Sequence, residues 1–587
     1  MHKLNVIELM RDDINSNTSP HFVFLGRHVP FRDADQVNID GTPPEVSLSV
    51  EGTNYELYRN MLYARHITKS DTAPVITYTE WESSVIYDQY DHTDDQLQTK
   101  NWYVVVKRGT NRDVFICLSN NNGRFSTIAP SYHDTLPQEA GGYETSDGYR
   151  WKYMYTVSQD NYLKFATPRY LPVIPNTEVS GNATPGAVNF VKVDYGGSQY
   201  DSYHSGTISV SRVGGSDFVY TIPNSASSNN DFYTRCAITI TSGPGVGQIR
   251  EITDYDGLSR TITISKKFDT TPTTSSTYDI TPLVVLVGDG TGFAGRALVN
   301  SFASNSVYKV EIIENGVNYT WATAQVTGNT GGTTNFATIT PIVDPFGGHG
   351  AFQSKELMAS GLCISTKFSS ADAGGKVLDV NEFRNIGLIK NAAFANVEIT
   401  AVSTEGFIVG DTLNQRDTGV SGTITNVTQT AIRVTDVIGY FNNTSNVYTS
   451  TAETDVSAIV GQQTYIDQTI KLSVSSVSGV YTADERVDQT TSVSTSANGI
   501  IYHANIVSGT GTLYLTNVYG TFTENAEDEL GGSDNITGNT STAHSTIVTS
   551  TQGDLVIGSG DVLYIDNKSP VSKSQGQTET VKIILEF

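Results

Sequence analysis

Four aspartates crowd one short segment of the chain, and their oxygens are the ligands that a hard cation such as calcium prefers. They are Asp88, Asp91, Asp94 and Asp95, in the run Tyr-Asp-Gln-Tyr-Asp-His-Thr-Asp-Asp. Their spacing does not match an EF-hand loop, and the glycine that such a loop needs for its sharp turn is missing. The sequence therefore favours an exposed acidic loop over a metal site.

A second candidate is the glycine-rich segment from Gly288 to Gly292, which reads Gly-Asp-Gly-Thr-Gly and resembles a phosphate-binding loop in composition. A phosphate-binding loop needs a strand before it, a helix after it and a lysine for the phosphates. Here the residues that follow read equally well as a strand, and no Gly-Lys-Ser/Thr occurs. We interpret this segment as a β-turn.

Histidines and carboxylates give no clear catalytic pattern. His349 lies between two glycines, and the other nine histidines are scattered without metal-ligand spacing or a known catalytic motif. Glu80 and Glu82, on either side of Trp81, are the best candidates for the paired carboxylates of glycoside cleavage, which must lie ~5–10 Å apart in space. A solvated strand with one buried aromatic side chain explains these residues more simply. We expect no enzyme activity and no catalytic, cofactor-binding or metal-binding residue.

The elements that would position such residues are mostly strands. Residues 149–157 place Tyr149, Trp151, Tyr153 and Tyr155 on one face of a strand that follows an Asp-Gly turn. An aromatic face of this size must pack on something. The segment has the character of a scaffold.

Composition points the same way. A chain of 587 residues is too long for one hydrophobic core, so several domains are expected. Only 17% of the residues are charged, and the Ser, Thr, Asn and Gly content favours sheets and turns. The expected fold class is all-β, with a few short helices, in multidomain sandwich-like or barrel-like modules. The 31 Tyr and 22 Phe residues suit subunit interfaces.

The net charge of −24 argues against nucleic acid or an anionic membrane as the main partner. Cys117, Cys236 and Cys363 are far apart and show no metal-ligand spacing, so we expect buried free thiols in a reducing cytoplasm. No run approaches the ~20 apolar residues of a membrane span, and the first residues lack the apolar core of a signal peptide. A soluble protein made in a cytosol is expected.

Changes in composition along the chain suggest five parts. Residues 1–178 hold three of the four Trp and one expected helix, which Thr53 and Glu56 would begin as a capping box. Residues 179–282 and 283–390 read as two β domains, in which 307–314 form a strand and Asn315-Gly316 a hairpin turn. Residues 353–358 suggest a short helix.

After Lys390 the basic residues almost disappear, and 391–550 read as an insertion of tandem small β modules. Within it, segments 406–441 and 480–522 look alike, each with an acidic turn, glutamines, strands and a final Tyr-Gly or Gly-Tyr. Residues 551–587 are expected to return to the core as strands, because an apolar C-terminus is usually tied into a sheet.

Several pieces occur in the order known from one protein family. They include Phe22-Val23-Phe24-Leu25-Gly26-Arg27, Asp147-Gly148-Tyr149-Arg150-Trp151-Lys152-Tyr153, and a closing strand after Gln577-Thr578-Glu579. In this order the pieces resemble the gene-eight baseplate wedge protein of T-even-like contractile-tail phages. The resemblance covers residues 1–178 and the last ~25 residues, and the insertion has no counterpart in it.

The resemblance implies a structural subunit of the tail baseplate wedge, assembled in the host cytoplasm and carried in the virion. It implies a homodimer that contacts other wedge proteins, namely the gene-six, gene-seven and gene-ten products, without a cofactor. The alternative function is a tail-fibre or adhesin-like protein that binds host glycans, or a polysaccharide depolymerase. The Ser/Thr/Gly-rich insertion motivates this alternative.

Overall fold

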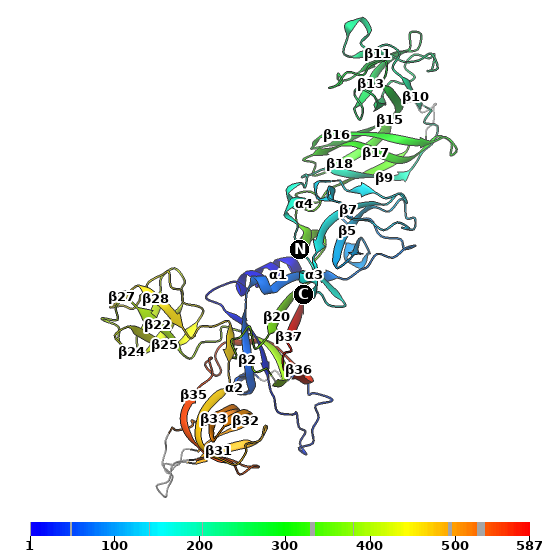
Figure 1. Cartoon of the computed structure of the whole chain (residues 1–587). Helices are drawn as coiled ribbons and strands as arrows, with labels where there is room; N and C mark the ends of the chain where they lie inside the picture. The colour runs from blue at the N-terminus through cyan, green and yellow to red at the C-terminus, as the bar shows by residue number, and fades with distance from the viewer. Residues whose placement is uncertain are drawn as a thin grey trace. The chain divides into compact units, whose positions relative to one another are not determined.

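A computed structural model describes residues 2–46, 50–139, 141–201, 203–328, 335–379, 381–490, 496–524 and 535–587. The chain forms two compact units, one made of residues 74–360 and the other of residues 2–73 and 361–587 (Figure 1). Strands dominate both units and the helices are short, so the all-β, multidomain fold class is confirmed. The finer division into five parts stays a prediction.

The first unit begins with a sheet in the order β4-β5-β7-β6. Its strands are β4 (Tyr103–Arg108), β5 (Asn111–Ser119), β6 (Tyr143–Glu144) and β7 (Arg150–Val157). The turn before β7 depends on Gly148, whose φ of +81° is costly for other residues. Trp151 is fully buried and stacks on Tyr149 with ring centroids 5.5 Å apart. The aromatic face therefore packs into a core, as the sequence predicted.

The rest of this unit is a run of antiparallel strands around a nine-stranded sheet, in which β15 pairs with β10, β12, β16 and β18. The strands are β8 (Tyr170–Pro172), β9 (Val188–Tyr195), β10 (His204–Thr207), β11 (Val219–Thr221), β12 (Cys236–Ser242), β13 (Ile249–Asp256), β14 (Thr261–Ile264), β15 (Thr277–Gly288), β16 (Thr291–Asn300), β17 (Ser306–Val317), β18 (Ala322–Thr327) and β19 (Thr338–Val343). The helices are α3 (Gln159–Phe165), α4 (Thr177–Gly181) and α5 (Gln353–Glu356), with 3-10 turns η2 (Leu97–Thr99), η3 (Leu136–Gln138) and η4 (Val213–Gly215).

Two turn predictions in this unit have opposite outcomes. Asp289 and Gly290 form the short connection between the antiparallel strands β15 and β16, as predicted, while Gly288, Thr291 and Gly292 lie in the strands themselves. Asn315 and Gly316 were expected to form a hairpin turn, and this prediction is wrong. They lie inside β17, where Asn315 pairs with Phe293 of β16 in regular register.

The second unit is built on a sheet in the order β29-β2-β1-β21-β36. The strands are β1 (His21–Gly26), β2 (Met61–Ile67), β21 (Asn381–Lys390), β29 (Tyr465–Asp467) and β36 (Asp561–Lys573). Beside it, β20 (Gly361–Phe368) pairs along its whole length with the terminal strand β37 (Glu579–Glu586). The end of the chain is therefore a strand tied into a sheet.

Helices of this unit differ in part from the expectation. The sequence did not predict α1 (His2–Ile14), which places Ile7 and Ile14 in the core. The expected helix exists as α2 (Val50–Asn60), but it begins before Thr53. The predicted capping box at Thr53 is therefore wrong, because this residue lies inside the helix. A 3-10 turn, η1 (Lys69–Asp71), follows β2.

Two small modules complete the second unit. The first module has β22 (Val397–Ala401), β23 (Thr412–Gln415), β24 (Ser421–Val427), β25 (Ala431–Ile438), β26 (Val447–Tyr448), β27 (Glu453–Thr454) and β28 (Val456–Val460). The second has β30 (Ile470–Ser478), β31 (Arg486–Thr490), β32 (Ser496–Val507), β33 (Thr510–Tyr519), β34 (Asn535–Gly538) and β35 (His544–Thr551), which close into a barrel.

The two modules repeat one arrangement of strands. The first strand of each pairs with the fourth and the last, and the second pairs with the third and fifth. The register also agrees, since Val397 lies opposite Val434 and Ile470 lies opposite Leu515. The similarity of the two sequence segments therefore corresponds to a structural repeat.

A buried glutamine occupies the same place in both modules. Gln415 donates to Asn442 O (2.6 Å) and accepts from Asn442 N (2.8 Å). Gln489 donates to Thr523 O (3.0 Å) and accepts from Thr523 N (2.8 Å). Each glutamine thus holds the backbone just after the fourth strand. We call this pair of hydrogen bonds the glutamine clamp.

Candidate functional site

The acidic segment uses its carboxylates for local hydrogen bonds. Asp91 accepts from Thr93 N (2.9 Å), Asp88 accepts from Asn101 N (3.0 Å), and Asp94 pairs with Lys100. Across the described ranges, no group of three or more His, Cys, Asp or Glu residues is placed to hold a metal ion. The aspartates therefore shape their own loop.

Glu80 and Glu82 are exposed, and each has a contact that a glycosidase pair would not need. The Glu80 carboxylate is ion-paired with Lys107 (2.8 Å), and the backbone of Glu82 is hydrogen-bonded to the Tyr87 hydroxyl (2.7 Å). Trp81 is half-buried and donates from its indole to Ser126 (3.1 Å). Trp81 packs as expected, but the predicted strand is wrong: apart from one isolated bridge between Glu80 and Val105, these residues lie in an extended loop after Thr77.

His349 lies at the centre of a buried charged cluster in the first unit. Its Nε2 is 3.3 Å from Asp344 Oδ1, and its Nδ1 is hydrogen-bonded to Glu356 Oε1. The second oxygen of Glu356 accepts from Gly350 N (2.7 Å), and the second oxygen of Asp344 accepts from Asn189. All three charged side chains are 5% exposed or less.

The cluster also contains Lys152 of β7, which donates to Glu139 O (2.8 Å). Burial lowers the pKa of Lys152 to about 8 and raises the pKa of Asp344 to about 6. Burial also acts to lower the pKa of His349, but Asp344 and Glu356 outweigh it and raise this pKa. These charges come from β7, the end of β19, the glycine turn and α5, so the cluster ties four segments together.

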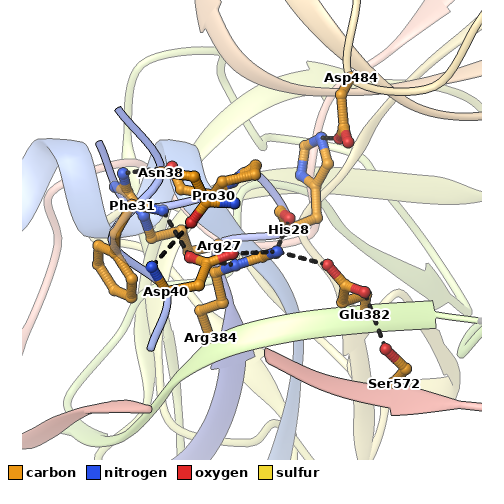
Figure 2. Close-up of polar contacts among 10 residues, drawn as sticks. All are labelled: Arg27, His28, Pro30, Phe31, Asn38, Asp40, Glu382, Arg384, Asp484 and Ser572. Atoms are coloured by element: carbon orange, nitrogen blue, oxygen red, sulfur yellow. Dashed lines mark hydrogen bonds and ion pairs between the residues drawn. The ribbon is translucent and has the colours of Figure 1, made fainter. Parts of the chain in front are cut away.

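A second polar cluster lies in the second unit, around Arg384 of β21 (Figure 2). The guanidinium binds the Asp40 carboxylate through two bonds, of 3.0 and 2.9 Å, and pairs with Glu382 at 2.6 Å. It also donates to His28 O, and Asp40 accepts from Phe31 N (2.8 Å). Burial acts to raise the pKa of Asp40, but the bonds from Arg384 and Phe31 outweigh it and lower this pKa.

His28 continues this cluster toward the second module, as Figure 2 shows for Asp484. The His28 ring is 4% exposed, with Nδ1 3.1 Å from Thr516 Oγ1 and Nε2 3.4 Å from Asp484 Oδ1. Burial and the charge of Arg384 lower the pKa of His28 to about 4. With this lowered pKa the His28 ring is neutral at pH 7, and its Nε2 lies near Asp484 without forming a hydrogen bond or a charged ion pair.

A cavity of about 370 Å³ lies beside the second module, between α2 and the segment after β35. Its walls include Ile470, Leu515 and Leu555, and its charged side chain is Arg59. Arg59 is already ion-paired with Glu56 (3.2 Å) and stacked over the Tyr519 ring. The cavity therefore offers apolar surface without convergent catalytic groups.

Sequence reasoning singled out His349 but missed its partners, and it missed the Arg384 cluster completely. Asp344 and Glu356 lie five and seven residues from His349, a spacing with no recognised motif. Arg384 and Asp40 are 344 positions apart, so only the folded chain brings them together. The one local signal was the Gly-Gly-His-Gly turn, in which all three glycines have positive φ.

The three cysteines are buried free thiols, as the sequence predicted. Among the described residues, no helix combines the length and apolar character needed to cross a membrane. Comparison with known proteins finds no family model and no curated protein that matches this chain. The chemistry of both clusters is that of holding backbone segments in place.

Proposed function

We propose that this chain is a non-enzymatic structural subunit of the baseplate wedge of a contractile phage tail. The observation that carries the proposal is the location, in the fold, of the segments that resemble the wedge family. The strand β1, from the family-like opening, pairs with β2 and β21, and β36 near the end of the chain pairs with β21. Strands from the opening of the chain (β1, β2) and from its last part (β36) thus meet in one sheet through β21, which lies outside the segments that resemble the family.

The use of charged groups supports a structural role. The buried carboxylate Asp40 is matched by Arg384, and the buried carboxylates Asp344 and Glu356 are matched by His349. A catalytic carboxylate or base needs access to a substrate. Groups that are buried and paired with one another instead fix the geometry of the fold.

The partners and location follow from the same proposal. The subunit would form a homodimer, contact the gene-six, gene-seven and gene-ten products of the wedge, and reside in the virion after assembly in the host cytoplasm. The acidic surface, with a net charge of −24, suits partners that carry basic patches. A glycan-binding fibre protein or a depolymerase stays the alternative.

The oligomeric state of the purified chain is the first test, measured by light scattering coupled to size exclusion. A wedge subunit is expected to have twice the 63.5 kDa mass of one chain, whereas a fibre is expected to be a trimer. The same preparation is then mixed with the three wedge partners and sedimented. Co-sedimentation of a dimer supports the proposal, and a trimer that binds host glycans contradicts it.

The depolymerase alternative has its own test. The purified chain is incubated with host capsule or lipopolysaccharide, and the release of reducing sugar is measured. The double variant Glu80→Gln, Glu82→Gln is the matched control. Sugar release by the natural chain that the control lacks would overturn the non-enzymatic proposal.

A further inference from the structure

We propose that His349 is protonated and, through Asp344 and Glu356, holds the segment 344–358 against the rest of the first unit; we call this charged ring the pin. Loss of its proton releases the segment. The proposal rests on the buried cluster and is independent of the proposed role in a baseplate. Asp344 stands at one end of this segment and Glu356 lies near the other, with His349 between them.

The placement of two carboxylates around the ring favours a proton on each ring nitrogen. Both nitrogens of His349 face carboxylate oxygens, Asp344 Oδ1 at 3.3 Å and Glu356 Oε1 in a hydrogen bond. An ionised carboxylate can only accept hydrogen bonds, and a neutral imidazole has only one N–H. Only an imidazolium can donate to Glu356 through Nδ1 and also present a second N–H and a positive charge to Asp344 Oδ1, which has no hydrogen-bond partner of its own.

The charges around the ring balance when His349 is protonated. Asp344 and Glu356 supply two negative charges, and His349 and Lys152 supply two positive charges. The other titratable or charged side chains whose fields reach this cluster are Tyr90, His92, Glu139, Arg150 and Lys355. A neutral ring would leave one buried negative charge uncompensated, which is costly in a low-dielectric interior.

The direction of the pH effect follows from the raised pKa of His349. Its stabilising contribution is complete below the ordinary value of 6.5 and is lost as the pH rises through the folded-state pKa. Asp344 acts in the same direction below pH 6, because its folded-state pKa is also raised. Lys152 has the opposite sign, since its lowered pKa of about 8 favours the folded state above that pH.

Release has a defined structural consequence. Gly347, Gly348 and Gly350 all have positive φ and give the backbone freedom once the pin is lost. The same segment carries Phe346 and Phe352, which stack with ring centroids 6.2 Å apart and are 83% and 52% exposed. The protonation state of one buried ring thus decides whether this aromatic pair is held in a fixed position.

Hydrogen exchange of the full chain, read by mass spectrometry between pH 6 and 9, tests the pin. After correction for intrinsic exchange rates, protection of peptides from 344–358 is expected to fall at least about tenfold as the pH rises. His349→Gln, whose side chain carries no titratable proton, should show low protection already at pH 6 and little change with pH. His133→Gln, at an exposed histidine of the same unit, should behave as the natural chain does.

Two outcomes would overturn the proposal. Protection that stays constant to pH 9 in the natural chain shows that the ring does not control the segment. The same pH dependence in His349→Gln assigns the effect to another group, such as Lys152. If His349→Gln fails to fold, Glu356→Gln replaces it: removing one negative charge should shift the loss of protection to lower pH, and no shift contradicts the pin.

Discussion

The two modules of the second unit share an order of strand pairing but differ in how they are joined to the rest of the molecule. Residues of the first module form one hydrophobic cluster with β1 and β2, including Phe22, Met61 and Val434. Residues of the second module form a cluster of their own, centred on Leu472, Leu513 and other side chains of its barrel. The same fold is thus an extension of the central core in one place and, apart from Tyr502, a separate core in the other.

The features that recur are those that the backbone demands. A glycine occupies the third strand in both modules, Gly422 and Gly499, and an added Cβ would lie 2.5 and 2.9 Å from a valine methyl group. A residue with positive φ follows in the fourth strand, Asp436 in one module and Asn517 in the other. Both types tolerate the left-handed region better than most residues, so the local bend is kept in each copy.

The features that differ are on the outer faces of the modules, where each module meets the rest of the unit or the solvent. In the second module Tyr502 is 8% exposed and packs against Tyr63 and His28, with centroids 6.3 and 5.2 Å apart. The equivalent residue of the first module is Thr425, which is exposed. The first module instead packs through Tyr440, whose ring lies 4.5 Å from that of His66. Attachment to the core is therefore a property of each copy and not of the shared fold.

Deleting one module at a time should give the largest contrast. Removing 397–460 would strip the central sheet of part of its own core, and each newly exposed large side chain such as Phe22 costs about 1.5–3 kcal/mol. A few such losses equal the whole stability of a typical domain. We expect this deletion to yield insoluble protein, and the deletion of 470–551 to yield soluble protein.

Both deletions can be joined by a short Gly-Gly link, because the chain ends meet. A Cβ added to Gly461 would lie 2.3 Å from Asn396 O, and one added to Gly553 would lie 2.8 Å from Gln468 O. Solubility and the thermal unfolding midpoint measure the result. Equal behaviour of the two deletions would show that the shared cluster of the first module does not matter for folding.

Tyr502 provides the next test of the comparison. Changing Tyr502→Thr gives the second module the residue of the first, and should loosen its attachment by about 2–4 kcal/mol through the lost packing on Tyr63 and His28. The reverse change, Thr425→Tyr, should alter stability by less than about 0.5 kcal/mol, since the site is exposed. Hydrogen exchange of β2 measures the loosening, and equal effects of the two changes would contradict the assignment.

How far the sequence predicted this picture depends on the range of the interaction. Alternation of apolar residues identified individual strands such as 149–157 and 307–314, because alternation is a local property of the chain, and similar local composition identified the repeat. The hairpin turn predicted at Asn315-Gly316 was wrong because it was based on local preference alone. Pairing of these residues with β16 overrides that preference. The Arg384–Asp40 pair leaves no local trace, and neither residue could have been selected without the folded chain.

The glutamine clamp should matter equally in both modules. Gln489→Leu removes two hydrogen bonds to the backbone of Thr523, each of which contributes about 0.5–1.5 kcal/mol. Gln415→Leu should cost a similar amount in the first module. In each variant, exchange protection should fall in the module that carries the change and be retained in the other module. If only one of the two variants lost protection, the clamp would not be a shared element.

An exposed ion pair should give the smallest effect and mark the limit of the comparison. Arg433 and Glu398 lie opposite each other on β25 and β22, 2.7 Å apart, and their side chains are 52% and 34% exposed. The second module has Tyr514 and Lys471 at these positions, so the pair is not part of the shared fold. Arg433→Ala should therefore cost at most about 1 kcal/mol, and less in high salt. A larger, salt-independent loss in a thermal unfolding series would mean that the first module depends on this pair and that its surface is not free to vary.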